Sequence, residues 1–248
     1  MSKKDNADKT PPELPHKKDP SVEDSPKVIL SLSGPPSIAK IIDCLLKSPD
    51  TILAELEKGN LKTVGARLAV TAILCLAIFG LILGLFSGGD QMWSAPVKVV
   101  AGLILSGLIT LPSLYIFSCL NGLEVSLKSV AGLLLSCLTL TGLLLLGFAP
   151  VSWIFSQSTH SDGFMGFLTL AFWLIALGFG LTLMFRTAKA KGAAKMNHLK
   201  IWAFIFVLVT LQMSTSLRPI IGESEDTFLP TEKKFFLQHW TQNWFDRY

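Results

Sequence analysis

Residues 68–86 read LAVTAILCLAIFGLILGLF, nineteen residues without a single charge. A helix rises 1.5 Å per residue, so this run is close to the ~20 residues that cross the ~30 Å hydrocarbon core of a bilayer. Four further apolar runs follow, at residues 99–120, 127–155, 164–185 and 199–217. The sequence therefore predicts an all-α fold, a polytopic membrane helical bundle with about five transmembrane helices over residues 60–222.

The composition supports the membrane and excludes several other classes. Half of the residues are hydrophobic and 16% are charged, against roughly 25% charged in soluble domains. The net charge of +4 comes from cations at segment ends rather than from a basic stripe with interleaved aromatics, so no nucleic-acid partner is expected. The cysteines (Cys44, Cys75, Cys119 and Cys137) form no Cys-x-x-Cys pair or Cys/His cluster, so neither a metal nor a cofactor is expected.

The segments on either side of the bundle are polar or amphipathic. Residues 1–36 combine six Lys with six Asp and Glu and hold seven of the thirteen prolines, which predicts a disordered cytosolic tail. Residues 37–59 predict two short amphipathic interfacial helices, the second capped by Ser48 and ended by Gly59. Packing of these helices under the bundle is the alternative.

The last segment, residues 223–248, is predicted to be an external tail rich in aromatic residues. Phe236, Trp240 and Trp244 recur every four residues, so a short helix would present an aromatic stripe. Such a stripe suits an interfacial anchor in the headgroup layer or a partner's groove.

The positions of the cations set the expected orientation. Residues 186–200 hold five basic residues and no acid, and Lys58, Lys62 and Arg67 precede the first span, whereas residues 87–97 and 157–163 contain no Lys or Arg. The positive-inside rule then places the N-terminus in the cytosol and the C-terminus outside.

Small residues predict where the helices approach one another. Gly80, Gly84 and Gly88 share one face of the first span, and Gly132 with Ser136 repeats the pattern in the third. These faces serve either packing within the chain or contact with an oligomer or partner. Pro112 should kink the second span, for shape or for gating.

Residues that could carry catalysis are few. No charged residue or His lies in the middle of a predicted span, which disfavours a proton relay and an intramembrane protease, so no enzyme is expected. The adjacent residues His160, Ser161 and Asp162 are interpreted as a solvated turn rather than a triad. His198, among lysines, is expected to face lipid headgroups.

The end of the fifth span is the strongest candidate site. Its outer half is polar, so it faces either other helices and a water-filled recess, or the interface, with the arginine reaching the phosphates. The residues of this predicted polar outer recess are Gln212, Ser214, Thr215, Ser216 and Arg218.

Three phrases within residues 38–222 resemble the Yip family of five-span membrane proteins. They are residues 42–56 with Leu46-Lys47-Ser48-Pro49-Asp50, then Leu114-Tyr115-Ile116-Phe117, and residues 211–222, similar to the Leu-Arg-Pro-Phe-Ile-Gly ending of uncharacterised bacterial members. The Asp-Leu-Tyr-Gly-Pro phrase of eukaryotic members is absent, so their small-GTPase and trafficking role is not carried over. The resemblance implies a non-enzymatic protein of the bacterial cytoplasmic (inner) membrane.

Two functions remain open. The first is a non-enzymatic membrane scaffold or accessory subunit whose partners are the lipid bilayer and other membrane-protein subunits, or a second copy of the chain. The alternative is a channel or transporter for a neutral or weakly polar solute, lined by Ser, Thr and Gln.

Overall fold

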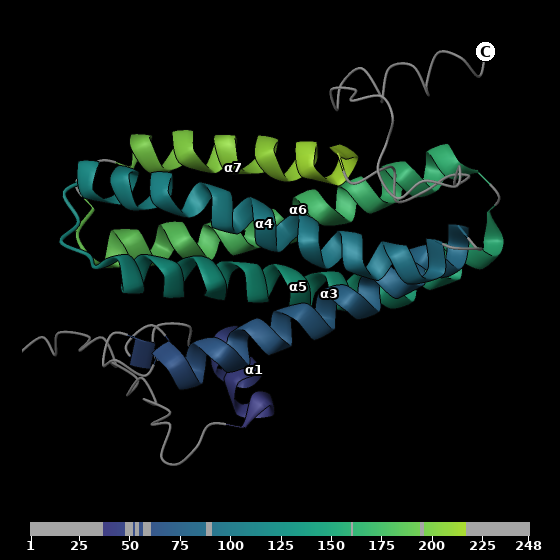
Figure 1. Ribbon diagram of the computed structural model, residues 1–248, viewed down its shortest axis with the longest axis horizontal. Helices are drawn as coiled ribbons and strands as arrows, with labels where there is room; N and C mark the ends of the chain where they lie inside the picture. The colour runs from purple at the N-terminus through teal and green to yellow at the C-terminus, as the bar shows by residue number, and fades with distance from the viewer. Residues whose placement is uncertain are drawn as a thin grey trace, which may run out of the picture. The chain divides into compact units, whose positions relative to one another are not determined.

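The computed structural model describes residues 37–47, 52, 55–56, 61–87, 91–159, 161–193 and 196–216. Within these residues the regular structure is entirely helical, which confirms the all-α prediction. The helices, shown in Figure 1, are α1 (Ile38–Lys47), η1 (Leu61–Gly65, a π-helix), α3 (Ala66–Ser87), α4 (Gln91–Leu120), α5 (Leu127–Ser158), α6 (Asp162–Ala190) and α7 (Asn197–Ser216).

Four of these helices, α3 to α6, are long and apolar enough to cross a membrane. This supports an integral membrane protein. The apolar part of α7, Asn197–Met213, is shorter. Five spans were predicted, and the fifth stays a prediction.

Two helix starts and ends differ from the predicted spans. α4 begins at Gln91, eight residues before the expected start at Val99, and therefore includes Pro96 and Lys98. α5 ends at Ser158, three residues after the expected end at Phe155, and contains Pro150. A proline is tolerated inside a membrane helix where neighbouring helices and local adjustments satisfy the freed backbone group.

Glycines in left-handed conformation end α4 and α6. Gly122 has φ 78° and Gly192 has φ 86°, a region that glycine enters without a Cβ penalty. Around Gly122, the Leu123 N–H donates to the Ser118 carbonyl (3.3 Å) and the Gly122 N–H to Cys119 (2.9 Å), and the same pattern recurs around Gly192. Both are Schellman motifs, and they start the short connections to α5 and α7.

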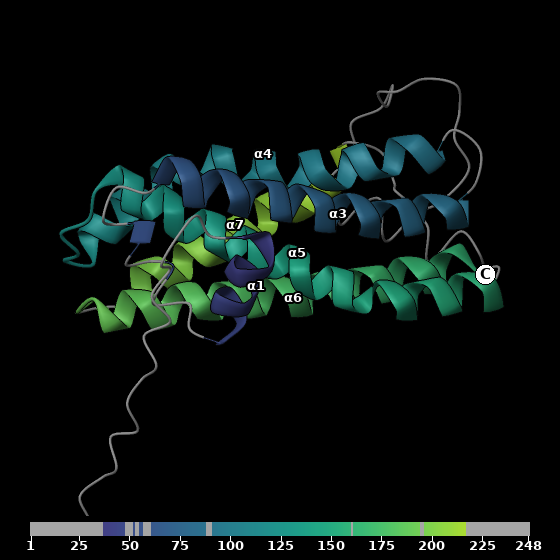
Figure 2. The same ribbon diagram turned by 90° about the horizontal axis from the view of Figure 1, so that it is seen from below.

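The long helices alternate in direction and lie side by side (Figures 1 and 2). α3 packs against α4 and α5, α6 packs on α5, and α7 packs mainly along α4. The starts of α3, α5 and α7 and the ends of α4 and α6 therefore lie at one end. We call it the basic end, because it carries Arg67, Lys128, Arg186 and Lys191.

Two apolar clusters make up the core. The larger joins α3 to α7 around Phe79, Trp202 and Phe206, which are fully buried. The smaller joins Ile41, Cys44 and Leu45 of α1 to a patch of the bundle that includes Leu68 and Leu183. The apolar face of α1 thus packs on the bundle.

Candidate functional site

At Gly80, the glycine face of α3 contacts another helix of the same chain, α4. A Cβ added there would lie 2.7 Å from Pro96 Cα and 3.1 Å from the Ala95 carbonyl oxygen of α4. Gly84 is buried, and Gly88 lies outside the described residues. The backbones of α3 and α4 therefore touch where the sequence predicted a close approach of helices.

The second small-residue face, on α5, receives the segment before the first span. Leu56 Cδ1 lies 3.0 Å from the Cβ position of Gly132. Ser136 is fully buried, and its hydroxyl donates to the Gly132 carbonyl at 2.9 Å. Gly132 thus makes room for a leucine of the same chain.

Other close approaches join the remaining helices. A Cβ at Gly180 of α6 would lie 2.6 Å from Thr141 Oγ1 and 2.9 Å from the Cys137 carbonyl oxygen, both on α5. The Thr139 hydroxyl of α5 is 3.1 Å from the Leu68 carbonyl of α3. Tight backbone contact and hydrogen bonds across helices are the forces that hold membrane bundles together.

The hydroxyls of the long helices are mostly satisfied within their own helix. Ten of them donate to the carbonyl four residues earlier: Thr71, Ser106, Thr110, Ser136, Thr139, Thr141, Ser158, Thr182, Thr187 and Thr210. Ser152 Oγ and Thr169 Oγ1 are buried without a hydrogen-bond partner in the described part of the chain. A water path needs hydroxyls that face it, and these ten hydroxyls are turned towards their own backbone.

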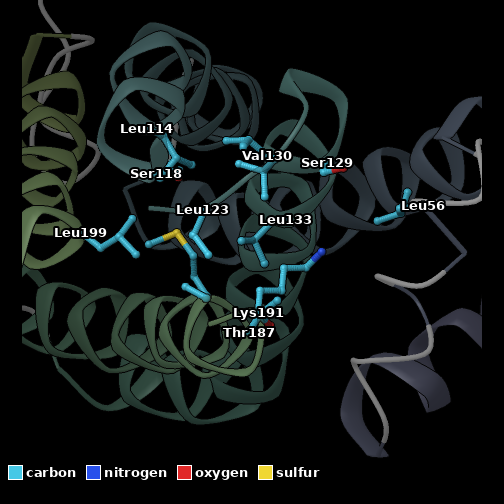
Figure 3. A pocket seen from close by; sticks show the side chains of 13 residues that line it. Leu56, Leu114, Ser118, Leu123, Ser129, Val130, Leu133, Thr187, Lys191 and Leu199 are labelled. Carbon is cyan, nitrogen blue, oxygen red and sulfur yellow. The ribbon is translucent and has the colours of Figure 1, made fainter. Parts of the chain in front are cut away.

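At the basic end, a small cavity lies between the ends of the helices. Leu114, Leu123, Leu133 and Leu199 point into it from different parts of the chain (Figure 3). Its volume of ≈ 20 Å³ is on the scale of one water molecule. Lys191, at the end of α6, also lines it, and burial lowers the pKa of this lysine.

At the same end, a polar contact joins Asn121, just after α4, to His198 of α7. The Asn121 amide nitrogen donates to the Phe117 carbonyl (2.8 Å), which leaves the Asn121 Oδ1 facing His198 Nδ1 at 3.3 Å. The His198 ring also stacks on Phe117, with the ring centroids 6.5 Å apart. The expectation that His198 faces lipid headgroups is therefore wrong, because the ring is used within the bundle.

The predicted polar outer recess is described only in part. Gln212 is half-buried near the end of α7, while Ser214, Thr215 and Ser216 form the last turn of that helix. Arg218 and the three predicted anchor residues (Phe236, Trp240 and Trp244) lie outside the described residues. The structure thus fixes the position of one recess side chain.

Sequence reasoning missed Lys98, which is 6% exposed inside α4. The charge interrupts the apolar run, so the predicted span began one residue later. The Met-Trp-Ser-Ala-Pro-Val stretch at residues 92–97 was the available signal that the helix extends further. Lys98 lies at the end of the bundle opposite the basic end.

The described residues contain no His/Cys/Asp/Glu group that could hold a metal ion. In the predicted turn of residues 160–162, Ser161 is the N-cap of α6, and its hydroxyl oxygen accepts a hydrogen bond from the Phe164 N–H at 3.4 Å. Asp162 is the first residue of α6, and His160 is not among the described residues. Ser161 therefore acts as a helix cap.

Comparison with protein-family models, with curated proteins and with solved structures finds no match for this chain. The resemblance to the Yip family stays a prediction.

Proposed function

We propose that this chain is a non-enzymatic scaffold or accessory subunit of a membrane-protein complex, and that it binds its partner through the outward face of α6. The proposal rests on a difference in the space around the Cβ positions of its glycines. Gly80, Gly132 and Gly180 are filled by the chain's own atoms, whereas Gly178 is exposed and no heavy atom lies within 4 Å of its Cβ position.

The open face of α6 continues on both sides of Gly178. Thr182, one turn later, is also exposed, and its hydroxyl donates to the Gly178 carbonyl at 2.8 Å. One turn earlier, Leu174 and Ile175 are exposed, and Ala171, two turns earlier, adds a further small residue in line with Gly178. Small residues let a second helix approach the backbone closely, which is how helices associate in lipid.

The basic-end cavity favours this function over the alternative of a channel or transporter. At ≈ 20 Å³ it has room for about one water molecule, not for the neutral or weakly polar solute of that alternative. Most hydroxyls of the long helices are bonded to their own backbone, as described above. This cavity and these hydroxyls therefore support packing better than passage of a solute.

The proposal includes a membrane arrangement. α7 is the fifth span, and the basic end faces the cytosol of a bacterial cell, as the positive-inside rule requires. α1 lies in the cytosolic interface, with Leu46 and Lys47 exposed and Lys47 Nζ 2.7 Å from Asp43 Oδ1. A relationship to the Yip family belongs to the same proposal.

The test is affinity purification from native membranes in a mild detergent, with mass spectrometry and native gels. We expect wild type to elute with a stoichiometric partner or as an oligomer, and Gly178→Leu to elute alone. Gly147→Leu is the matched control: Gly147 of α5 is equally exposed and open, but Leu140 and Val151 stand where the row of Gly178 has the smaller Ala171 and Thr182. A solitary wild-type protein, or equal complexes for all three, would contradict the proposal.

A further inference from the structure

Two buried hydroxyls, one on α5 and one on α6, have no hydrogen-bond partner in the described part of the chain. They are Ser152 Oγ and Thr169 Oγ1, and the two residues are 0% and 8% exposed. A buried hydroxyl without a hydrogen bond is costly, so native proteins satisfy nearly all such groups with protein atoms or with bound water. Ten other hydroxyls of the long helices bond to the carbonyl four residues earlier. These two hydroxyls therefore need a partner other than their own helix.

The packing of α5 against α6 brings Ser152 and Thr169 to the same level. Thr141 of α5 and Gly180 of α6 are in contact, because a Cβ at Gly180 would lie 2.6 Å from Thr141 Oγ1. Ser152 is 152 − 141 = 11 residues after Thr141. Thr169 is 180 − 169 = 11 residues before Gly180. Because the two helices are antiparallel (Figure 2), both steps lead about 17 Å towards the end opposite the basic end.

Both hydroxyls also belong to the faces that α5 and α6 turn towards each other. Eleven residues make three turns of an α-helix and only about 20° more, so each residue keeps the direction of the contact residue three turns away. Ring contacts on both sides show that the two helices stay together over this stretch. Towards the basic end, Phe148 stacks on Phe172 with the ring centroids 4.6 Å apart. Towards the opposite end, the rings of Phe155 and Phe164 are 5.4 Å apart.

The burial of Ser152 and Thr169 limits the size of a molecule that can bind to both. Ser152 has no exposed surface and Thr169 has almost none, so a lipid headgroup or a side chain of a partner protein does not reach both hydroxyls. A water molecule is small enough, and buried waters make about two to four hydrogen bonds to polar groups that lack other partners. Ser152 is 158 − 152 = 6 residues from the end of α5, or about 9 Å along the helix, so the membrane surface is near.

We propose that one ordered water molecule binds between α5 and α6 and bridges the hydroxyls of Ser152 and Thr169. Each hydroxyl has one donor and two acceptor lone pairs, so the water satisfies both residues and links the two helices. Hydrogen bonds between helices help to hold a membrane bundle together, and a bond through an ordered water is nearly as favourable in enthalpy as a direct one. The site is separate from the open face of α6, because Gly178 is two residues, or about 200° around the helix, from Gly180.

NMR of the full chain in nanodiscs, with isotope-labelled threonine methyl groups, tests for the water directly. We expect a cross-peak between water and the Thr169 methyl in wild type, and its loss in Ser152→Ala, which removes the second partner of the water. Thr141 is the matched control: it is fully buried between the same two helices, and its hydroxyl donates to the Cys137 carbonyl at 2.9 Å. A wild type without the cross-peak at Thr169, or with an equal one at Thr141, would overturn the proposal. So would a cross-peak that persists in Ser152→Ala.

Reversible unfolding in detergent gives a second test, in which the sign of the effect decides. With the water bound, Thr169→Val breaks a hydrogen bond and lowers the denaturant midpoint of unfolding. With an unpaired hydroxyl, the same substitution removes a costly buried polar group and raises the midpoint. Ser152→Ala should lower the midpoint less in the Thr169→Val background than in wild type, because the bridge needs both hydroxyls, whereas its effect should not change in the control background Thr141→Val. Raised midpoints in both single variants, or additive losses in the double variant, would contradict the bridge.

Discussion

Individual glycines show how closely the helices of this bundle approach. The row of Gly80, Gly84 and Gly88 could be predicted from spacing alone, and Gly80 indeed lies at a close contact, with Pro96. The neighbour could not be predicted, because a small-residue face is the same whether its partner belongs to the same chain or to another. Gly180 was missed for a similar reason, because its importance depends on what packs against it.

The matched pair Gly180→Ala and Gly178→Ala tests the close contact at the residue scale. Gly180→Ala should destabilise the bundle by about 1–3 kcal/mol, because the new methyl meets Thr141 Oγ1 at 2.6 Å and the Cys137 carbonyl oxygen at 2.9 Å. Gly178→Ala, two residues away on the open face, should change the stability by no more than about 0.5 kcal/mol. Reversible unfolding in detergent measures both, and equal stabilities would contradict the packing of α6 on α5.

At the scale of the elements, most helices could be predicted from the sequence. The apolar runs predicted α3, α5, α6 and α7 with small errors at the ends, since length and lack of charge suffice for membrane helices. The start of α4 was placed too late because Lys98 ended the apolar window. The way α7 attaches to α4 could not be predicted, because its hydrogen bonds join residues 92 apart in sequence (Trp202 and Thr110) and 77 apart (His198 and Asn121).

The attachment of α7 to α4 gives a prediction at this scale. Trp202→Phe keeps a ring in the core but removes the donor to the Thr110 carbonyl, and such interhelical bonds contribute about 0.6–2 kcal/mol. Hydrogen–deuterium exchange should therefore rise in α7 and leave α5 unchanged. Trp153→Phe is the control, because Trp153 is 43% exposed on α5. Unchanged exchange in α7 after Trp202→Phe would show that this bond does not hold the helix.

At the scale of the whole molecule, the membrane bundle follows from composition and runs of apolar residues, and the packed interior follows from the structure. The described helices place Arg67, Lys128, Arg186 and Lys191 at one end, as the predicted loops required. The polar recess could be predicted only as a polar stretch of one helix.

The most direct test of a five-span bundle with a cytosolic basic end is cysteine labelling in intact cells by a membrane-impermeant maleimide. In a background without the native cysteines, we expect labelling of Ser158→Cys and of a cysteine appended after Tyr248. Ala190→Cys, at the basic end, should be labelled only after permeabilisation. Labelling of the appended cysteine only after permeabilisation would show that α7 does not cross, and labelling of Ala190→Cys in intact cells would contradict the orientation.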